Sequence, residues 1–254
     1  MQNTTQTFPE EIRALIGEGE FADTSGCSGA QTLYIPRINA FLKIAPCGSL
    51  TAAARMQAFF AAQNLSAPLL QYVSADRDYM LTAAIPGLDG TAPRHLAEPQ
   101  RLSEVFGTSL RRLHDASVAG CPVTDRNARL LCEAQTAQFR ADHLLCLAPY
   151  IGPADENCVP SEIAETAHIL QTDALIHGDY CLPNIMLDDW RLSGFIDLAD
   201  GGLGDRHYDL AWGLWTLRYN LKSDEYGHHF LDAYGRDLID KKRLRLCGLL
   251  AAMA

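Results

Sequence analysis

The spacing of apolar and polar residues divides the chain into a strand-rich first part and a mainly helical second part. Before Pro86, short apolar runs separated by turn residues predict four strands and two helices. The strands are predicted at 31–35, 40–44, 69–74 and 79–85, and the helices at 9–16 and 50–63. Residues 36–39 and 75–78 are typical of the connections between paired strands. This part therefore predicts a small antiparallel sheet with helices beside it.

Beyond Pro86 the apolar positions recur at helical spacing. A helix is predicted at 102–115, where Leu102, Phe106, Leu110 and Leu113 share one face. Further helices are predicted at 135–147, 161–170, 209–219 and 238–250. The exception is 174–198, where apolar runs at 184–187 and 192–198 flank the turn 188–191 and predict a hairpin. The pattern predicts an α+β protein with domains at 1–85 and 86–254.

Composition narrows the class of protein. The chain has 254 residues, of which 48% are hydrophobic, which is enough to bury a core. Its apolar runs are far shorter than the ~18 residues of a membrane span, and no basic segment precedes an apolar leader. The net charge of −10 disfavours binding to nucleic acid. Most of this negative charge lies from Pro86 onward, which favours a cationic small molecule there, although solvated acidic faces are the commoner cause.

The eight cysteines predict neither a disulfide framework nor a zinc site. They are spread along the chain with no Cys-x-x-Cys pair and no Cys/His ligand spacing. Without a secretion signal, they indicate reduced thiols in a cytoplasmic protein.

One lysine and one acidic motif carry candidate chemistry. Lys43 is the only lysine in the first 221 residues, and it lies within an apolar strand. Asp179 follows a His-Gly pair, Asn184 lies five residues later, and Asp197 lies at the end of the predicted hairpin. A carboxylate that orients a hydroxyl, with an amide and a second carboxylate that hold magnesium, is typical of phosphoryl transfer. The alternatives are an edge-strand lysine that reaches solvent, an Asp179 that bonds only backbone and an Asp197 that caps a helix.

Several segments resemble the aminoglycoside phosphotransferases of the protein-kinase-like fold, and most closely the aminoglycoside 3'-phosphotransferases. These segments are GCSGA (26–30), DYMLTAAIPG (78–87), RRLHDASVAGCP (111–122), HGDYCLPNIM (177–186) and SGFIDLADGGLGDRHYDLA (193–211). The resemblance implies a two-lobed fold. Residues 1–85 would form the nucleotide-binding N-lobe, and residues 86–254 the catalytic and substrate-binding C-lobe with its catalytic hairpin.

The resemblance also implies a role for each matching residue. Asp179 would be the catalytic carboxylate, Asn184 and Asp197 would bind Mg²⁺, and Asp209 would be a buried support for the catalytic loop. The remaining residues would bind ATP or GTP: Lys43 at the phosphates, Ser28 at the β-phosphate, Phe41 against the adenine, and the backbones of Ala83 and Ile85 at its edge. Phe41 and Ile85 could instead be core residues, and Ser28 a turn residue.

The sequence departs from this family in two places. Residues 44–75 contain no acidic residue, so the helix glutamate that normally pairs with the strand lysine is missing. We therefore expect weakened catalysis or an altered nucleotide pose. The C-terminal residues are apolar where the family has acidic ones, and the preceding helix carries Trp212, Trp215, Thr216 and Tyr219 on the face where charged residues are expected. Asp155, Glu156 and Asp200 are the remaining candidates to contact a cationic substrate.

The leading hypothesis is an ATP- or GTP-dependent, Mg²⁺-dependent enzyme that phosphorylates a hydroxyl of a small molecule, with aminoglycosides as the first class. One alternative is a metabolic kinase of the same superfamily that acts on choline, an amino alcohol or a sugar. An aromatic pocket that includes Trp215 and Tyr219 would favour this metabolic kinase, although helix packing alone also explains these aromatic residues. The second alternative is a nucleotide-binding pseudo-kinase, which the absence of a helix glutamate to pair with Lys43 favours.

Overall fold

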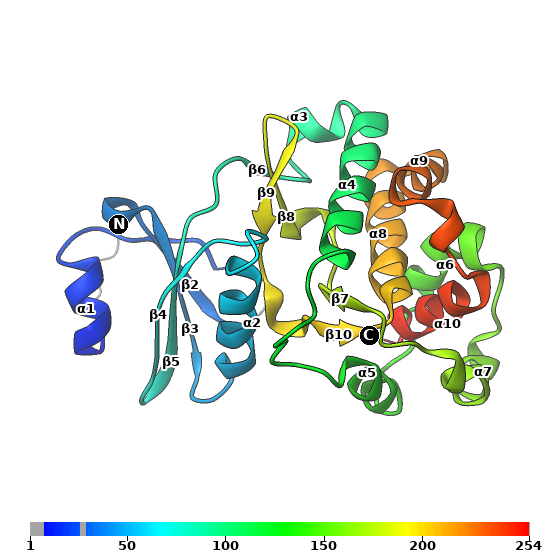
Figure 1. Ribbon diagram of the computed structural model, residues 1–254, viewed down its shortest axis with the longest axis horizontal. Helices are drawn as coiled ribbons and strands as arrows, with labels where there is room; N and C mark the ends of the chain where they lie inside the picture. The colour runs from blue at the N-terminus through cyan, green and yellow to red at the C-terminus, as the bar shows by residue number, and fades with distance from the viewer. Residues whose placement is uncertain (1–7, 26–28, 254) are drawn as a thin grey trace. The chain divides into compact units, whose positions relative to one another are not determined.

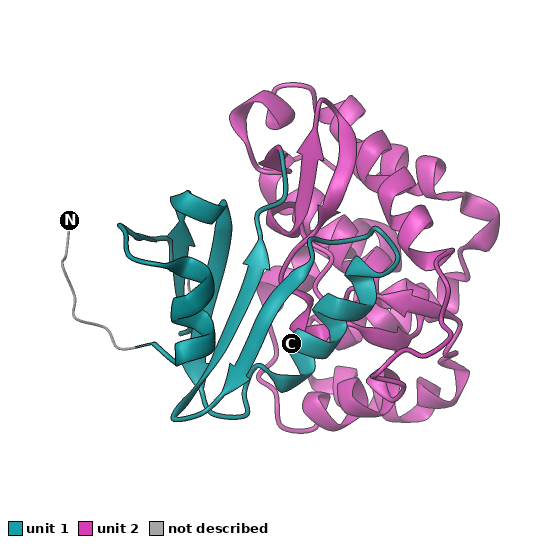
Figure 2. Ribbon diagram, turned by 60° about the vertical axis from the view of Figure 1, so that its left-hand side comes forward, with its two compact units in different colours: residues 1–86 teal, residues 87–254 magenta. Residues whose placement is uncertain are grey.

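The protein consists of two compact units. The computed structural model describes residues 8–25 and 29–253, and it divides at Pro86 and Gly87 into a first unit of 1–86 and a second unit of 87–254 (Figure 2). Each unit has its own sheet or sheets and its own helices, and each is described separately below. In the described part of the chain, no helix is both long enough and apolar enough to span a membrane.

The described residues of unit 1 form a five-stranded antiparallel sheet with one helix on each face (Figure 1). Its elements are α1 (Glu10–Ile16), β1 (Ala22–Asp23), β2 (Gln31–Ile35), β3 (Ala40–Pro46), α2 (Thr51–Ala61), β4 (Leu69–Ser74) and β5 (Arg77–Ala83). The strand order is β1-β2-β3-β5-β4, which places β3 at the centre. Both helices and four of these strands agree with the sequence pattern.

Alternation along β3 separates its two faces. Leu42 and Ile44 are fully buried in a cluster with Ile12 and Ile16 of α1. Ala45 is buried in a second cluster with residues of α2 and with Met80 of β5. Because side chains two residues apart lie on the same face of a strand, Lys43 shares the face of Ala45, which α2 covers.

Unit 2 is mainly helical, and its described residues form two small antiparallel sheets. Its elements are β6 (Leu88–Asp89), α3 (Pro93–Leu96), α4 (Pro99–His114), α5 (Arg126–Ala134), α6 (Ala141–Ile151), α7 (Val159–Thr166), β7 (Ala174–Ile176), β8 (Ile185–Asp188), β9 (Arg191–Phe195), β10 (Gly202–Gly204), α8 (Arg206–Leu221), α9 (Glu225–Tyr234) and α10 (Lys241–Ala251). Strand β8 pairs with β6 and β9, and β7 pairs with β10. The hairpin predicted from the sequence is β8–β9.

Helix α8 is the centre of unit 2. It packs against α4, α6, α9 and α10, as Figure 1 also shows. Its Leu210, Leu214 and Leu217 are fully buried. Between α4 and the loop after β7, the ring of Phe106 stacks on that of Tyr180 with 4.3 Å between centroids. The core of this unit therefore holds the loop after β7 against two helices.

The helix predicted at 135–147 is wrong in its first half. Helix α5 ends at Ala134 and α6 begins at Ala141, and the intervening segment bonds instead to the C-terminal end through Arg140 N–H and Ala252 O (2.7 Å). Helix α9 was not predicted because Gly227 weakens its helical pattern. Packing requires that glycine, since a Cβ there would lie 2.1 Å from the Tyr150 hydroxyl.

A buried ionic network joins α8, α10 and the segment before β7. The Asp205 side chain is fully buried and accepts hydrogen bonds from Arg243 Nε (2.8 Å), Gln171 N (2.9 Å) and His207 N (3.0 Å) and Nδ1 (2.8 Å). Arg243 also bonds Asp173 at 2.6 Å. Burial raises the pKa of Asp205, but the bonds from His207 and Arg243 lower it more, so that the net pKa is about 2.

We expect Asp205→Asn to lower the free energy of unfolding by about 3 kcal/mol at pH 7, because it leaves Arg243 buried beside a neutral amide. The stabilisation from the ionised carboxylate is complete above the ordinary pKa of 3.8 and is lost as the pH falls toward the folded pKa of about 2. Urea unfolding of both proteins between pH 7 and pH 3 measures the difference. Asp142→Asn, at an exposed carboxylate beside Arg140, is the control and should change stability much less. Equal unfolding free energies for Asp205→Asn and wild type would contradict this account.

Candidate active site

The candidate catalytic loop begins where β7 ends, and one buried carboxylate fixes its backbone. Asp209 of α8 accepts the backbone N–H of His177 at 2.6 Å through Oδ2 and that of Gly178 at 2.8 Å through Oδ1. Asp209 is fully buried, so these bonds also satisfy a charge that would otherwise be costly. The proposed role of Asp209 as a support for the loop rests on these two bonds.

The His177 ring ties the loop to the end of the hairpin. Its Nδ1 accepts the Asp179 N–H (3.3 Å), and its Nε2 lies 3.0 Å from the Ile196 carbonyl, which can only accept. The ring hydrogen therefore lies on Nε2. Gly178 has a φ of +83°, and a Cβ there would lie 2.0 Å from the Asp200 carbonyl oxygen, so only glycine allows this approach.

The buried His114 side chain contacts Asp209 directly, and the buried Tyr234 side chain in turn contacts His114. His114 of α4 places Nε2 3.2 Å from Asp209 Oδ2, and its Nδ1 lies 2.8 Å from the Tyr234 hydroxyl. Arg206 donates to the same hydroxyl at 3.4 Å. His114 lies in one of the segments that resemble the family, but the sequence indicates no role for it. Its partners are 95 and 120 residues away, so no local pattern could have indicated them.

Asp179 and Asn184 are in direct contact. The Asn184 amide donates from Nδ2 to the Asp179 carbonyl (2.9 Å) and to Asp179 Oδ2 (2.8 Å). Asp179 is half-buried, whereas Asn184 is buried. The loop thus holds Oδ2 of Asp179 in a fixed position and directs the Asn184 NH₂ group toward Asp179.

The hairpin β8–β9 brings Asp197 beside this pair. Ile185 pairs with Phe195 at its open end, and the Ile196 N–H donates to the Asn184 carbonyl (3.0 Å). Asp197 follows directly and is exposed. It occupies the N-cap position of the short helix η5 (Leu198–Asp200), but its side chain makes no capping hydrogen bond there. The helix-cap interpretation of Asp197 is therefore not supported.

The oxygen atoms of Asn184 and Asp197 suit a magnesium ion. Mg²⁺ binds carboxylate and amide oxygens and usually needs only one or two protein ligands besides phosphate and water. Asn184 directs its NH₂ group to Asp179, which leaves the amide oxygen for a metal. The residues present thus fit this ion.

Helix α8 holds the next residues of the loop. Thr216 Oγ1 accepts the Leu182 N–H at 3.3 Å. Burial raises the pKa of the Cys181 thiol well above its ordinary value, as does its proximity to Asp179. Cys181 is therefore a neutral neighbour of Asp179. The sequence analysis places Thr216 on the helix face expected to meet a substrate, whereas its contact with this loop is evident only from the fold.

The three candidates for substrate contacts lie on two segments of unit 2, Asp155 and Glu156 on one and Asp200 on the other. Asp200 ends η5, and its carboxylate is 3.6 Å from Arg126 of α5. Asp155 precedes the short helix η2 (Glu156–Cys158), and its side chain accepts the Asn157 N–H at 3.0 Å. Glu156 is exposed. Their roles toward a substrate remain predictions.

The nucleotide-binding candidates of unit 1 lie around β3 and β5. Phe41 and Lys43 share one face of β3, and the Phe41 ring is 5.0 Å from that of Tyr34. Ala83 ends β5 and donates its N–H to Pro68 O (3.1 Å), so a contact to a nucleotide there would use its carbonyl. Ile85 lies just beyond, and Ser28 lies outside the described residues.

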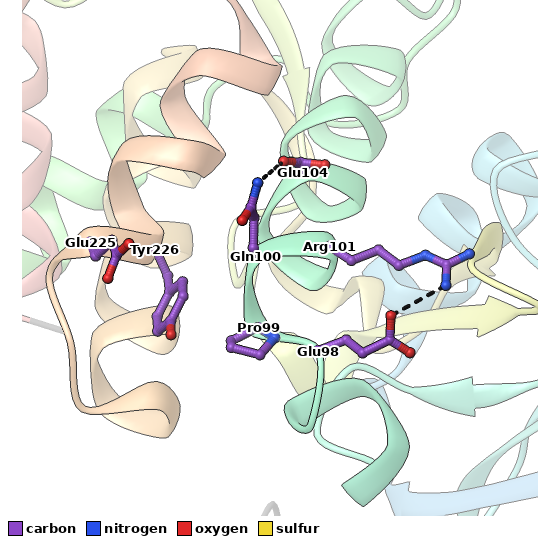
Figure 3. Close-up of a pocket in the computed structure, with 7 residues that line it drawn as sticks. All are labelled: Glu98, Pro99, Gln100, Arg101, Glu104, Glu225 and Tyr226. Atoms are coloured by element: carbon purple, nitrogen blue, oxygen red, sulfur yellow. Dashed lines mark hydrogen bonds and ion pairs between the residues drawn. The ribbon is translucent and has the colours of Figure 1, made fainter.

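A surface pocket of about 370 Å³ lies elsewhere in unit 2 (Figure 3). It is formed by the beginnings of α4 and α9 and is lined by Glu98, Pro99, Gln100, Arg101, Glu104, Glu225 and Tyr226. None of the predicted site residues lines it, so we do not regard it as the catalytic site.

Comparison with known proteins identifies the family. Residues 35–247 match the phosphotransferase enzyme family, APH. A probable aminoglycoside 3'-phosphotransferase of Lactococcus lactis subsp. lactis (strain IL1403) is 37% identical over 246 residues, which cover 96% of this chain and 94% of the relative. An aminoglycoside 3'-phosphotransferase of Niallia circulans is 30% identical over 261 residues, which cover 96% and 97% of the two chains.

Solved structures show the same fold. A crystal structure of aminoglycoside-3'-phosphotransferase of type VIII matches with a TM-score of 0.73 at 24% identity and covers 96% of this chain and 97% of that one. Aminoglycoside phosphotransferase APH(3'')-Id from Streptomyces rimosus, in complex with ADP and streptomycin, matches with a TM-score of 0.70 at 23% identity over 95% of both chains. These findings confirm the fold and the resemblance that the sequence predicted. The chain belongs to the phosphotransferase enzyme family and has the fold of the aminoglycoside phosphotransferases.

Proposed function

We propose that this protein transfers the γ-phosphate of ATP to the 3'-hydroxyl of an aminoglycoside. The observation that carries the proposal is the fixed contact between Asp179 and Asn184 beside Asp197, in a chain 37% identical to a probable aminoglycoside 3'-phosphotransferase. Unit 1 would bind the nucleotide, and unit 2 would supply catalysis and the acceptor site.

Each residue has a chemical task in this proposal. Asp179 accepts the hydrogen of the attacking hydroxyl at Oδ1, while Asn184 holds its other oxygen. Asn184 Oδ1 and the Asp197 carboxylate hold Mg²⁺, which, when bound, offsets negative charge on the phosphates. Lys43 contacts these phosphates, and Ser28 contacts the β-phosphate. Phe41 packs on the adenine, and the backbones of Ala83 and Ile85 bond its edge.

The donor and the acceptor are inferred from relatives. The S. rimosus structure contains ADP and streptomycin, and a structure of a thermostable APH(4)-Ia mutant contains AMP-PNP and hygromycin B. These complexes favour ATP over GTP and an aminoglycoside acceptor. Asp155, Glu156 and Asp200 would attract its ammonium groups. ATP is abundant in the cytoplasm, where we place the reaction.

We expect Asp179→Asn to lower kcat for kanamycin phosphorylation about 10³-fold, because the amide cannot accept the hydroxyl proton. Coupled nucleotide-turnover assays with Mg²⁺ and either ATP or GTP measure kcat. The affinity of Asp179→Asn for ADP, measured by direct binding, should stay within about twofold of the wild-type value. Asp142→Asn, an exposed carboxylate of the same unit, is the control. An aminoglycoside that lacks the 3'-hydroxyl should not be phosphorylated. Nucleotide binding by the wild type without turnover of any alcohol would instead indicate a pseudo-kinase.

The missing glutamate leads to a second prediction. Helix α2 carries no acidic residue. Two of its alanines, Ala53 and Ala54, are buried against the side of the sheet on which Lys43 lies. An ion pair from this helix therefore cannot orient the lysine. We expect kcat/KM for ATP to be about tenfold below that of relatives with an acidic residue in this helix, measured side by side. A value equal to theirs would show that another contact orients Lys43 equally well.

The aromatic residues of α8 favour a second candidate, a kinase for an amino alcohol or another amine. Trp215 stacks on Tyr219 with 5.2 Å between centroids, and it is 5.4 Å from Trp212. Thr216, the next residue after Trp215, contacts the catalytic loop. Within the described residues, the Trp215 indole N–H has no hydrogen-bond partner. Aromatic faces bind quaternary and primary ammonium groups through cation–π attraction.

If this row contacts the acceptor, Trp215→Ala should raise KM for the preferred acceptor about tenfold, with less effect on kcat. Trp215→Phe keeps an aromatic face and should retain most of the affinity. Steady-state kinetics with kanamycin and a panel of amino alcohols would show which acceptor depends on the row. An unchanged KM for every acceptor would mean that these side chains only pack the helix.

A further inference from the structure

The tip of the catalytic hairpin has an unusual backbone for its sequence. Strands β8 and β9 are joined by two residues, Asp189 with φ of +45° and Trp190 with φ of +62°. A two-residue turn with positive φ at both positions normally carries Asn-Gly or Asp-Gly. A tryptophan in this conformation costs free energy, because its Cβ crowds the backbone. Other contacts must therefore hold Trp190 in place.

Those contacts come from two helices at the beginning of unit 2. Only 9% of the Trp190 surface is exposed. The His95 ring of α3 meets it edge-on at 4.9 Å, and the Arg101 guanidinium of α4 lies 4.5 Å from the ring centroid. Glu98 accepts a hydrogen bond from Arg101 at 3.3 Å, as Figure 3 shows. The indole is thus fixed between a ring and a cation.

The same contacts continue to the segment that precedes these helices. His95 is buried, and its Nδ1 lies 2.7 Å from the Asp89 carbonyl oxygen. Asp89 belongs to β6, which pairs with β8. The Gly90 N–H lies 2.9 Å from the Leu182 carbonyl of the catalytic loop and 3.1 Å from the Ile185 carbonyl at the start of β8. Contacts therefore lead from Trp190 through His95 to β6, and from Gly90 after β6 to the catalytic loop and the start of β8.

We propose that Trp190 is a positioning residue: by anchoring the tip of the hairpin, it holds the open end, where Asn184 and Asp197 lie, in the geometry needed for phosphoryl transfer. This inference rests on the proposed function. The hairpin is short, with four residues in β8 and five in β9, so rotation at its tip would move its open end. The open end is joined across the strands by the bond from Ile196 N–H to Asn184 O.

The test uses two substitutions with different effects on the backbone. Trp190→Ala removes the anchor and keeps a side chain in the unfavourable conformation, whereas Trp190→Gly removes both the anchor and the strain. Trp190→Gly should therefore be more stable than Trp190→Ala, yet both should lose activity equally. Val159→Ala, in the buried core of α7, is the matched control for lost stability.

We expect both Trp190 variants to lower kcat about tenfold at a temperature where they are folded, with KM for the acceptor within about twofold. Two readouts do not depend on turnover. The affinity for Mn²⁺ in the presence of ADP, measured by electron paramagnetic resonance, should fall several-fold. Hydrogen exchange at the Ile196 amide should become faster, and Val159→Ala should change none of these.

The proposal would be overturned if folded Trp190→Gly had the kcat, the Mn²⁺ affinity and the Ile196 exchange rate of the wild type. Trp190 would then be a purely stabilising residue. If the wild type phosphorylates no acceptor, the proposed function fails, whereas the Mn²⁺ and exchange measurements still decide the role of Trp190. If wild type also binds no Mn²⁺ with ADP, exchange at Ile196 decides it alone.

Discussion

The candidate site depends on the pair of hydrogen bonds by which Asp209 holds the loop after β7. A buried carboxylate is stable only where donors surround it, and the backbone N–H groups of His177 and Gly178 are such donors. These two residues follow a strand, where their N–H groups would otherwise need partners of their own. One interaction thus satisfies a charge and fixes a loop. Asp179, the next residue, takes its position from this bond and from the His177 ring.

The second constraint is the hairpin, which makes neighbours of residues that are far apart in sequence. Asn184 and Asp197 are thirteen residues apart, yet the bond from Ile196 N–H to the Asn184 carbonyl brings their segments together. His177 bonds the carbonyl of the same Ile196. Ile196 therefore links the loop and the hairpin, since its N–H bonds Asn184 and its carbonyl bonds His177. A displacement of the loop would disturb the hairpin, and the reverse also holds.

The sequence indicates candidates for the reacting groups, whose roles remain predictions, and only one of the side chains that hold them, Asp209. Asp179, Asn184 and Asp197 lie in short segments whose residue types and spacing reflect the chemistry, and the hairpin follows from two apolar runs and a turn. His114 and Thr216 could not be found in this way, because each contacts the loop only after distant helices have packed. The same reason explains the error at 135–140, where a long-range bond to Ala252 replaces the expected helix. The substrate contacts of Asp155, Glu156 and Asp200, which the sequence suggests, remain predictions.

The departures from the family lie on α2, on α8 and in the C-terminal residues, and not on the loop or the hairpin. Helix α2 has alanines where an acidic partner for Lys43 is expected, and α8 has aromatic residues where charges are expected. On α8, however, Asp209 and Thr216 still bond the loop, and they share the helix with Trp212 and Trp215. One face of the same helix can therefore change its chemistry toward a ligand while the other keeps the loop in place. Residues 209 and 216 are two turns apart and share one face of α8, whereas the aromatic row follows the adjoining face.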